Sequence, residues 1–215
     1  LDYRVQEKPS GIAEAFLIAE NFIGNDSVCL VLGDNIFYGQ GLGEELEKIT
    51  QLSGASIFGI EVADPERYGV LEIDDARNVV SIEEKPSKPK SRYAVPGIYF
   101  YPNNVVELTR NLSPSPRGEL EITDLNLLYL ERGQLICRIL NRSTAWFDTG
   151  TFKSLNDASN FLRVIDERQG IKVGVPEEIA LRKGFIEAES LQVQLHRYPV
   201  NEYRAYLETL LENDT

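Results

Sequence analysis

The sequence predicts an α/β protein in which a mixed sheet is flanked by helices and a helical segment follows at the C-terminal end. Three observations predict this fold class. Apolar runs of strand length alternate with amphipathic helical stretches over residues 1–62. Short strand patterns separated by turns then dominate residues 68–101, and the sequence after residue 176 is helical. We therefore predict a core over residues 1–170 and a helical C-terminal segment over residues 171–215.

Hydrophobic periodicity and turn residues assign the individual elements. The run at residues 28–32 is rich in β-branched side chains, which is typical of a central parallel strand. The strand at residues 93–101 is expected to bulge at Pro96 and Gly97. We expect strands at residues 1–5, 28–32, 55–62, 68–73, 79–83, 93–101, 135–140 and 146–148. We expect helices at residues 11–23, 41–52, 103–111, 119–132, 152–168, 177–183, 187–194 and 202–211.

Composition and charge limit the partners of the chain. The net charge of -12 argues against nucleic acid and against an anionic membrane surface as partners. It permits a small phosphorylated substrate, because a local cluster or a metal ion can bind phosphate in an acidic protein. Cys29 lies in an apolar run, and two buried, reduced thiols at Cys29 and Cys137 predict a cytoplasmic location. Because His196 is the single histidine, a histidine-rich metal site is excluded.

The N-terminal end of the sequence has two unusual features. The chain contains no methionine and begins at Leu1. Residues 1–5 alternate between apolar and polar side chains like a strand already under way. We therefore expect that an N-terminal portion precedes Leu1 and holds the first strand of the sheet.

Two apolar runs end abruptly in an acidic residue beside glycine. The run at residues 28–32 leads to Asp34, and the run at residues 145–147 leads to Asp148. We expect each run to be a buried strand that delivers a carboxylate to its carboxyl end, where ligands bind in open α/β sheets. Two such carboxylates would suit a divalent cation that carries phosphates. Each aspartate alone could instead be a turn residue bonded to nearby backbone amides, but the pair favours a metal site.

A charged group follows the strand at residues 79–83. Lys85 could supply a point charge for a phosphate, and Glu84 could accept hydrogen bonds from hydroxyl groups. Pro86 restricts the backbone of Lys85, which favours a fixed direction for the lysine side chain. The alternative is a solvated charge cluster, which is the usual outcome for such runs. Arg117 similarly could form an ion pair near a helix start or could bind an anion there.

Three further features allow both a binding role and a structural one. The Gln6 amide could bind a nucleobase edge, and Gly11 could let a planar ring approach the backbone, or both could belong to an ordinary loop. Tyr68 and Gly69 could hold a sugar hydroxyl or form a plain turn. Trp146 could simply belong to the core, as most single tryptophans do.

Seven co-linear stretches together carry a family resemblance. They include LGDNIFYG at residues 32–39, DPERYGV at residues 64–70 and AWFDTGT at residues 145–151. The other four lie at residues 5–16, 83–86, 93–101 and 113–124. With these stretches the chain resembles, over nearly its whole length, the glucose-1-phosphate thymidylyltransferases, also called dTDP-glucose pyrophosphorylases.

The resemblance implies a Rossmann-like sheet of the nucleotidyltransferase type and a defined reaction. The family joins dTTP to glucose 1-phosphate, releases pyrophosphate and needs Mg²⁺, which makes the first activated sugar of dTDP-rhamnose biosynthesis. The resemblance implies that Asp34 and Asp148 hold the metal and that Lys85 and Arg117 lie at the phosphates. It implies that Gln6 and Gly11 face thymine. The other substrate-binding residues that it implies are Ile12, Tyr68, Gly69, Glu84, Val95 and Trp146.

The resemblance also bears on assembly and regulation. It implies a homotetramer and inhibition by dTDP-rhamnose at a second site, which Glu178, Ile179 and Arg182 match in part. The family opens with a glycine-rich loop and a lysine that grip the triphosphate, and nothing in this chain matches them. We expect this phosphate loop to lie in the portion before Leu1, so that the chain alone could be inactive. Two alternatives stay open: an enzyme that uses another nucleotide, such as UTP, and a non-catalytic regulator that binds a nucleotide sugar.

Overall fold

The computed structural model describes residues 1–49 and 52–213, and the chain divides into two compact units. The first unit is Leu1–Thr149 and the second is Gly150–Thr215. Helix α6 (Phe152–Gln169) therefore falls in the second unit, whereas the sequence placed the end of the core at residue 170.

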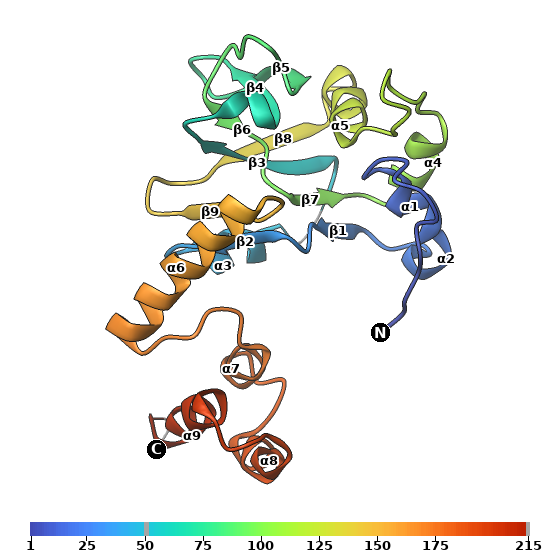
Figure 1. Cartoon of the computed structure of the whole chain (residues 1–215). Helices are drawn as coiled ribbons and strands as arrows, with labels where there is room; N and C mark the ends of the chain where they lie inside the picture. Colours follow the sequence, from blue (N-terminus) through green and yellow to red (C-terminus); the bar gives the residue numbers. More distant parts are fainter. Residues whose placement is uncertain (50–51, 214–215) are drawn as a thin grey trace. The chain divides into compact units, whose positions relative to one another are not determined.

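The first unit is built on a mixed sheet. Its strands in chain order are β1 (Val28–Val31), β3 (Ala55–Glu61), β4 (Gly69–Ile73), β5 (Val79–Glu84), β6 (Tyr93–Ala94), β7 (Ile98–Tyr101) and β8 (Leu135–Ile139). Within the described residues they lie in the order β1-β7-β3-β6-β4-β5, with β8 beside β3 (Figure 1). The β3–β8 pair is parallel and the other pairs are antiparallel, which confirms the predicted mixed sheet.

Two predictions about the start of the chain are wrong. Residues 1–5 form no strand, and Leu1, Tyr3 and Val5 are exposed. The run that was expected to be a central parallel strand is instead β1 at the end of the strand order, where it pairs antiparallel with β7. Partly buried and exposed residues alternate along β1, so one face of the strand is uncovered, and Cys29 on that face is exposed rather than buried. Cys137 on β8 is partly buried, and burial raises the pKa of its thiol to about 12.

The predicted strand at residues 93–101 is two strands rather than one bulged strand. β6 pairs with β3 and β4, whereas β7 pairs with β1 and β3. Val95 still donates to the Gly69 carbonyl and the Gly97 carbonyl still accepts from Leu32, but Pro96 between them has no N–H to donate, and the chain changes partner strands here. This β6–β7 linker separates the two parts of the sheet.

A separate two-stranded ribbon consists of β2 (Asn35–Tyr38) and β9 (Ala145–Asp148). β2 was not expected from the sequence. The two strands are antiparallel, with Asn35 opposite Asp148. β9 is only partly buried, so the expected buried strand before Asp148 is in fact an element of a half-exposed ribbon.

Short helices flank the sheet of the first unit. Helices α1 (Glu14–Ile18) and α2 (Glu20–Ile23) replace the single helix expected at residues 11–23, because the backbone at Ala19 departs from helical angles (φ −92°, ψ 5°). Helix α3 (Leu42–Glu47) lies within the range expected at residues 41–52, of which residues 50 and 51 lie outside the described part of the chain.

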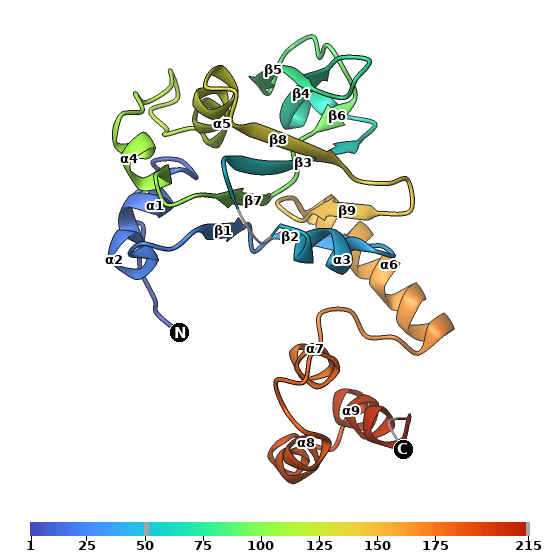
Figure 2. The same cartoon turned by 180° about the vertical axis from the view of Figure 1, so that it is seen from behind.

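Two further helices, α4 (Val105–Arg110) and α5 (Ile122–Glu131), complete this unit and agree with the predicted positions. Figures 1 and 2 show α5 beside β5 and β8, and α4 beside α1. The core between helices and sheet is mostly aliphatic and includes a group of aromatic rings, of which Phe16 and Tyr101 meet edge to face at 5.2 Å. The buried Tyr101 hydroxyl donates to Asn126 on α5 (2.6 Å), which ties this helix to β7.

The second unit is helical, as expected. After α6 it contains α7 (Pro176–Arg182), α8 (Ala188–Gln194), the 3-10 turn η2 (Leu195–Arg197) and α9 (Glu202–Asn213). Thr151 and Ser154 form a reciprocal capping box at the start of α6, which confirms the predicted cap. The last helices pack around Val175, Leu195 and Leu207. None of the described helices combines the length and the apolar character needed to cross a membrane.

One carboxylate joins these last helices. Glu177 on α7 accepts hydrogen bonds from the hydroxyls of Tyr198 and Tyr203, one at each carboxylate oxygen and both at 2.5 Å. Burial alone would raise the pKa of Glu177, but the two hydrogen bonds outweigh it and lower the pKa below its ordinary value. The ionised side chain therefore stabilises the folded unit.

Replacing Glu177 with glutamine is expected to lower the melting temperature at pH 7 and to have little effect near pH 3. A lowered folded-state pKa gives stability that is present above the unfolded-state pKa of about 4.3 and is lost as the pH falls through the folded-state value. Thermal unfolding of the wild type and of Glu177→Gln at both pH values measures the effect. A difference in melting temperature between the two proteins that is as large near pH 3 as at pH 7 would contradict this explanation.

Candidate active site

A cavity of about 260 Å³ lies in the first unit where several strands end. Its walls come from the β1–β2 junction, the 3-10 turn η1 (Pro65–Arg67), the end of β5, the β6–β7 linker, α5 and β9. The lining residues are Ile12, Leu32, Asp34, Asn35, Arg67, Tyr68, Gly69, Glu84, Lys85, Val95, Gly97, Tyr99, Ile122, Thr123, Asn126, Trp146 and Asp148. Most of the residues that the sequence singled out therefore line a single cavity.

The backbones of the two aspartates lie side by side because β2 and β9 are antiparallel. β1 leads through Asp34 into β2, and the first residue of β2 lies opposite Asp148, the last residue of β9. The backbone N–H and the hydroxyl of Thr149 both donate to the carbonyl of Asp34, at 2.9 and 2.8 Å. The Asp34 carboxylate also accepts a hydrogen bond from the Asn35 amide at 2.8 Å. The local fold thus fixes both acidic residues at the same wall of the cavity.

The two carboxylates could serve a divalent cation that also binds a phosphorylated ligand. Among residues 1–49 and 52–213, no three histidine, cysteine, aspartate or glutamate side chains cluster closely enough to hold a metal alone. Mg²⁺ usually binds through one or two carboxylates and completes its shell with water and substrate phosphates. Asp34 and Asp148 at one cavity wall provide that number of carboxylates.

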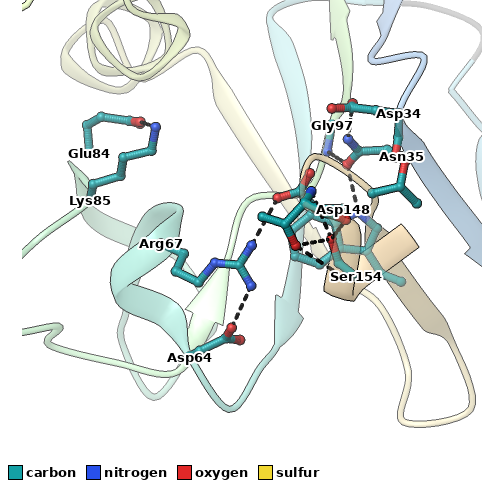
Figure 3. Close-up of polar contacts among 12 residues, drawn as sticks. Asp34, Asn35, Asp64, Arg67, Glu84, Lys85, Gly97, Asp148 and Ser154 are labelled. Carbon is teal, nitrogen blue, oxygen red and sulfur yellow. Dashed lines mark hydrogen bonds and ion pairs between the residues drawn. The ribbon is translucent and has the colours of Figure 1, made fainter. Parts of the chain in front are cut away.

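Lys85 lies on the opposite wall with an uncommon backbone conformation. Its φ is +44°, a left-handed value that a residue with a side chain seldom adopts. The backbone N–H of Lys85 donates to the Tyr68 carbonyl at 3.0 Å, which helps to hold this conformation. The Lys85 Nζ atom lies 3.7 Å from Glu84 Oε1, and Figure 3 shows the lysine side chain turned toward that carboxylate. Such local strain is commonest at functional sites.

The Glu84 carboxylate is held by Lys85 at one oxygen and by a residue of α5 at the other. The buried Thr123 hydroxyl on α5 donates to Glu84 Oε2 at 2.6 Å. A Cβ atom at Gly69 would lie 3.1 Å from the Thr123 hydroxyl and 3.4 Å from Glu84 Oε2, so glycine leaves room for this hydrogen bond. One Glu84 oxygen is therefore anchored, while the other faces Lys85.

Two aromatic side chains, Tyr68 and Trp146, also line the cavity. The rings of Tyr68 and Trp146 lie 4.8 Å apart, and burial raises the pKa of the Tyr68 hydroxyl. The Trp146 Nε1 donates to Asn35 Oδ1 at 2.7 Å, and the same oxygen accepts a bond from the Gly97 N–H at 3.1 Å. Asn35 thereby connects β9, the β6–β7 linker and the Asp34 carboxylate.

Several lining residues were not predicted as site residues from the sequence. They are Leu32, Asn35, Arg67, Gly97, Tyr99, Ile122, Thr123 and Asn126. Asn35 and Arg67 adjoin the predicted Asp34 and Tyr68, so their position beside those residues was an available signal. Thr123 and Asn126 lie one turn apart on α5, and no local pattern distinguishes them from other residues of an amphipathic helix.

Comparison with known proteins is consistent with this site. Residues 1–164 match the model of the nucleotidyl transferase family. The chain is 53% identical over 214 residues to the glucose-1-phosphate thymidylyltransferase of Mycolicibacterium smegmatis and 50% identical to that of Mycobacterium tuberculosis. Each match covers 100% of this chain and 74% of the relative. The chain belongs to the glucose-1-phosphate thymidylyltransferase family.

Solved structures extend the comparison to the fold. A Bacillus anthracis protein assigned to the same activity, solved in complex with a sucrose, superposes with a TM-score of 0.67 at 46% identity. That match covers 75% of this chain and 65% of the solved chain. A UDP-glucose pyrophosphorylase complexed with UDP-glucose gives a TM-score of 0.66 at 22% identity and shares the fold. These neighbours confirm the predicted nucleotidyltransferase-type architecture.

Three residues that the family resemblance assigned to the site do not line the cavity. The Gln6 amide donates to the Gly11 carbonyl (3.0 Å) and to Glu14 (2.6 Å). Gly11 has a φ of +102°, and a Cβ atom there would lie 2.4 Å from the Leu120 carbonyl oxygen. The close approach at Gly11 is thus to the protein's own backbone. Arg117 pairs with Glu121 at 2.8 Å and lies 3.7 Å from Glu84, which agrees with its ion-pair alternative.

The residues assigned to an effector site lie in the second unit. Glu178, Ile179 and Arg182 are all on α7. The Glu178 carboxylate pairs with Arg182 at 2.6 Å and accepts a hydrogen bond from Tyr206 at 2.6 Å, whereas Ile179 is exposed. The effector role of these residues stays a prediction for this family member.

Replacing Thr123 with valine is expected to raise the KM for the sugar phosphate about five- to tenfold and to leave kcat within about twofold. The substitution keeps the shape of the side chain but removes the donor that anchors Glu84. A hydrogen bond to a charged group contributes about 1.5–3 kcal/mol, and water can replace part of it here because the Glu84 side chain is 25% exposed. Steady-state kinetics with varied glucose 1-phosphate measures the effect.

Thr109→Val is the matched control for this substitution. Thr109 is equally buried, and its hydroxyl bonds to the Val105 carbonyl within α4, outside the cavity lining. Both variants should lose a similar amount of unfolding free energy, about 1 kcal/mol. If Thr109→Val changed the KM as strongly as Thr123→Val, the effect would be a general loss of stability rather than loss of the Glu84 anchor.

Proposed function

We propose that the chain transfers a deoxythymidylyl group from dTTP to glucose 1-phosphate, forming dTDP-glucose and pyrophosphate. The observation that carries the proposal is the cavity in which two carboxylates at adjoining strand ends face a lysine–glutamate pair. Negative charge suits a metal-bound phosphate on one wall, and mixed charge suits a phosphorylated sugar on the other. Family membership adds the named activity of relatives that are about half identical to this chain.

In the proposed reaction a phosphate oxygen of glucose 1-phosphate attacks the α-phosphorus of dTTP. A new P–O bond forms as the bond to the pyrophosphate oxygen breaks, so no covalent enzyme intermediate arises. Lys85 offsets the charge of the sugar phosphate as it approaches the nucleotide, and Glu84 accepts hydrogen bonds from sugar hydroxyls. Tyr68, Gly69 and Val95 hold the sugar in line, with Trp146 and Ile12 beside them.

The proposed cofactor is magnesium, held by Asp34 and Asp148. A bound Mg²⁺ offsets phosphate charge and orients the reactants. The protein's part is to fix both carboxylates through the β2–β9 ribbon, so that the site needs little reorganisation when the nucleotide binds. The thymine contacts of Gln6 and Gly11, the phosphate contact of Arg117, the dTDP-rhamnose effector and the homotetramer remain predictions from the family.

Pyrophosphate release by the full-length protein tests the proposed function. With glucose 1-phosphate and magnesium present, dTTP is expected to support release and UTP to support less. Chelation of the divalent cation with EDTA should stop release, and added magnesium should restore it. Equal or greater turnover with UTP would reassign the nucleotide. Binding of dTDP-glucose without turnover of any nucleotide would favour the non-catalytic regulator.

A further inference from the structure

Arg67 lines the cavity and contacts two residues that the mechanism uses, Asp148 and Tyr68. It ends the η1 turn, and its Nη1 pairs with Asp64 Oδ2 at 2.9 Å. Its Nη2 lies 3.6 Å from Asp148 Oδ2, and its Cζ lies 5.2 Å from the centre of the Tyr68 ring. Figure 3 shows the guanidinium between the Asp64 and Asp148 carboxylates.

The Arg67–Asp148 pair is a weak contact that a ligand can exchange. The distance of 3.6 Å is longer than a charge-assisted hydrogen bond, and the two side chains are 40% and 25% exposed. Ion pairs of this kind contribute little, at most a few-fold in an equilibrium constant. The shorter contact with Asp64 and the ring of Tyr68 keep the guanidinium at the cavity when Asp148 is engaged elsewhere.

Arginine and a divalent cation compete for the same carboxylate oxygen. When a cation takes Asp148, the guanidinium loses that partner but still lines the cavity. Its planar fork of donors then matches the oxygens of a phosphate group, which it can bind through two parallel hydrogen bonds. The incoming reactants supply such groups.

We propose that Arg67 is a further substrate-binding residue of this cavity: it pairs with Asp148 in the ligand-free protein and binds a phosphate group of the reactants once a divalent cation occupies Asp148. The proposal rests on the proposed function for the identity of the reactants. It assigns Arg67 two successive partners, so its removal has opposite effects on cation binding and on substrate binding.

Manganese binding without nucleotide provides the first test. Mn²⁺ is titrated into the full-length protein and the free ion is followed by electron paramagnetic resonance, with no turnover involved. Arg67→Gln is expected to tighten Mn²⁺ binding about two- to fivefold, because the competing charge is gone. Arg92→Gln is the matched control, since Arg92 pairs with Glu61 at 3.1 Å, outside the cavity lining, and its removal should change nothing. Asp148→Asn should weaken Mn²⁺ binding strongly.

Substrate kinetics provides the second test. Arg67→Gln is expected to raise the KM for glucose 1-phosphate or for dTTP at least about tenfold, as loss of a charge-assisted contact predicts. Arg67→Lys keeps the charge but not the fork, and should raise the same KM less while leaving Mn²⁺ binding as in the wild type. This second variant keeps the test decisive if Arg67→Gln does not fold.

Three outcomes would overturn the assignment. The first is Mn²⁺ binding that is unchanged or weaker in Arg67→Gln, and the second is a KM for both reactants that stays at the wild-type value. The third is Mn²⁺ binding that does not depend on Asp148. Failure of the proposed function looks different: the wild type would release no pyrophosphate from dTTP. Separate titrations of glucose 1-phosphate and of dTTP by calorimetry, with Mn²⁺ bound, would still report the role of Arg67.

Discussion

Lys85→Ala in the full-length protein is expected to lower kcat about 10²–10³-fold with little loss of stability. The ammonium group is the proposed charge that lets a sugar phosphate approach the triphosphate, and loss of one electrostatic contact of this type costs that factor in other enzymes. Pyrophosphate release at saturating substrate concentrations measures the change. Near-normal turnover would show that Lys85 has another role.

Two further variants separate the charge of Lys85 from its backbone. Lys88→Ala removes an exposed lysine three residues away, outside the cavity lining, and should leave turnover unchanged. Lys85→Gly removes the same ammonium group but relieves the left-handed backbone at φ +44°. It should therefore lose turnover as Lys85→Ala does while its unfolding free energy rises by about 1 kcal/mol. Higher stability of Lys85→Gly than of Lys85→Ala, with equal loss of turnover, would show that the left-handed backbone costs stability and that the ammonium group carries the activity.

Gly11→Ala is expected to lower the unfolding free energy by about 2–5 kcal/mol. A Cβ atom at Gly11 would lie 2.4 Å from the Leu120 carbonyl oxygen, and the φ of +102° is strained for any side chain. Backbone atoms cannot move aside as a side chain can, and Leu120 leads directly into α5, which carries Thr123. Chemical denaturation gives the unfolding free energy of each variant.

Gly133→Ala controls for the backbone angle alone. Gly133 has a φ of +65°, and nothing lies within 4 Å of the position that a Cβ atom would take there. It should lose only about 1 kcal/mol, the cost of a left-handed residue. If both variants lost the same amount, the contact with Leu120 would not be the reason for glycine at position 11.

The acidic strand ends were predictable because their signal is local. An apolar run that stops at Asp34 or Asp148 marks a strand end without reference to the rest of the chain. The pairing that brings the two aspartates side by side, however, depends on β2. The sequence of β2, Asn-Ile-Phe-Tyr, shows no alternation of polar and apolar residues. The hydrogen bond between Trp146 and Asn35 joins residues 111 positions apart, and no spacing along the sequence encodes such a contact.

The error at β1 has a similar physical origin. A central strand and an edge strand can have the same apolar composition, because burial depends on what covers each face rather than on the strand itself. Val31 is 54% exposed although its neighbours in sequence suggest a core strand. The prediction for residues 93–101 was partly right, because Pro96 and Gly97 do mark a break in the strand. The sequence does not indicate that the two halves pair with different sets of strands.

Trp146 is the single tryptophan of the chain, and its indole lies in the cavity wall between Tyr68 and Asn35. Tryptophan emission from these 215 residues, excited at the red edge of protein absorption, therefore reports on this cavity. Occupancy of the cavity can be followed by fluorescence without attaching a dye or adding a coupling enzyme. The same signal, read in a stopped-flow instrument, would separate the arrival of each reactant from the chemical step.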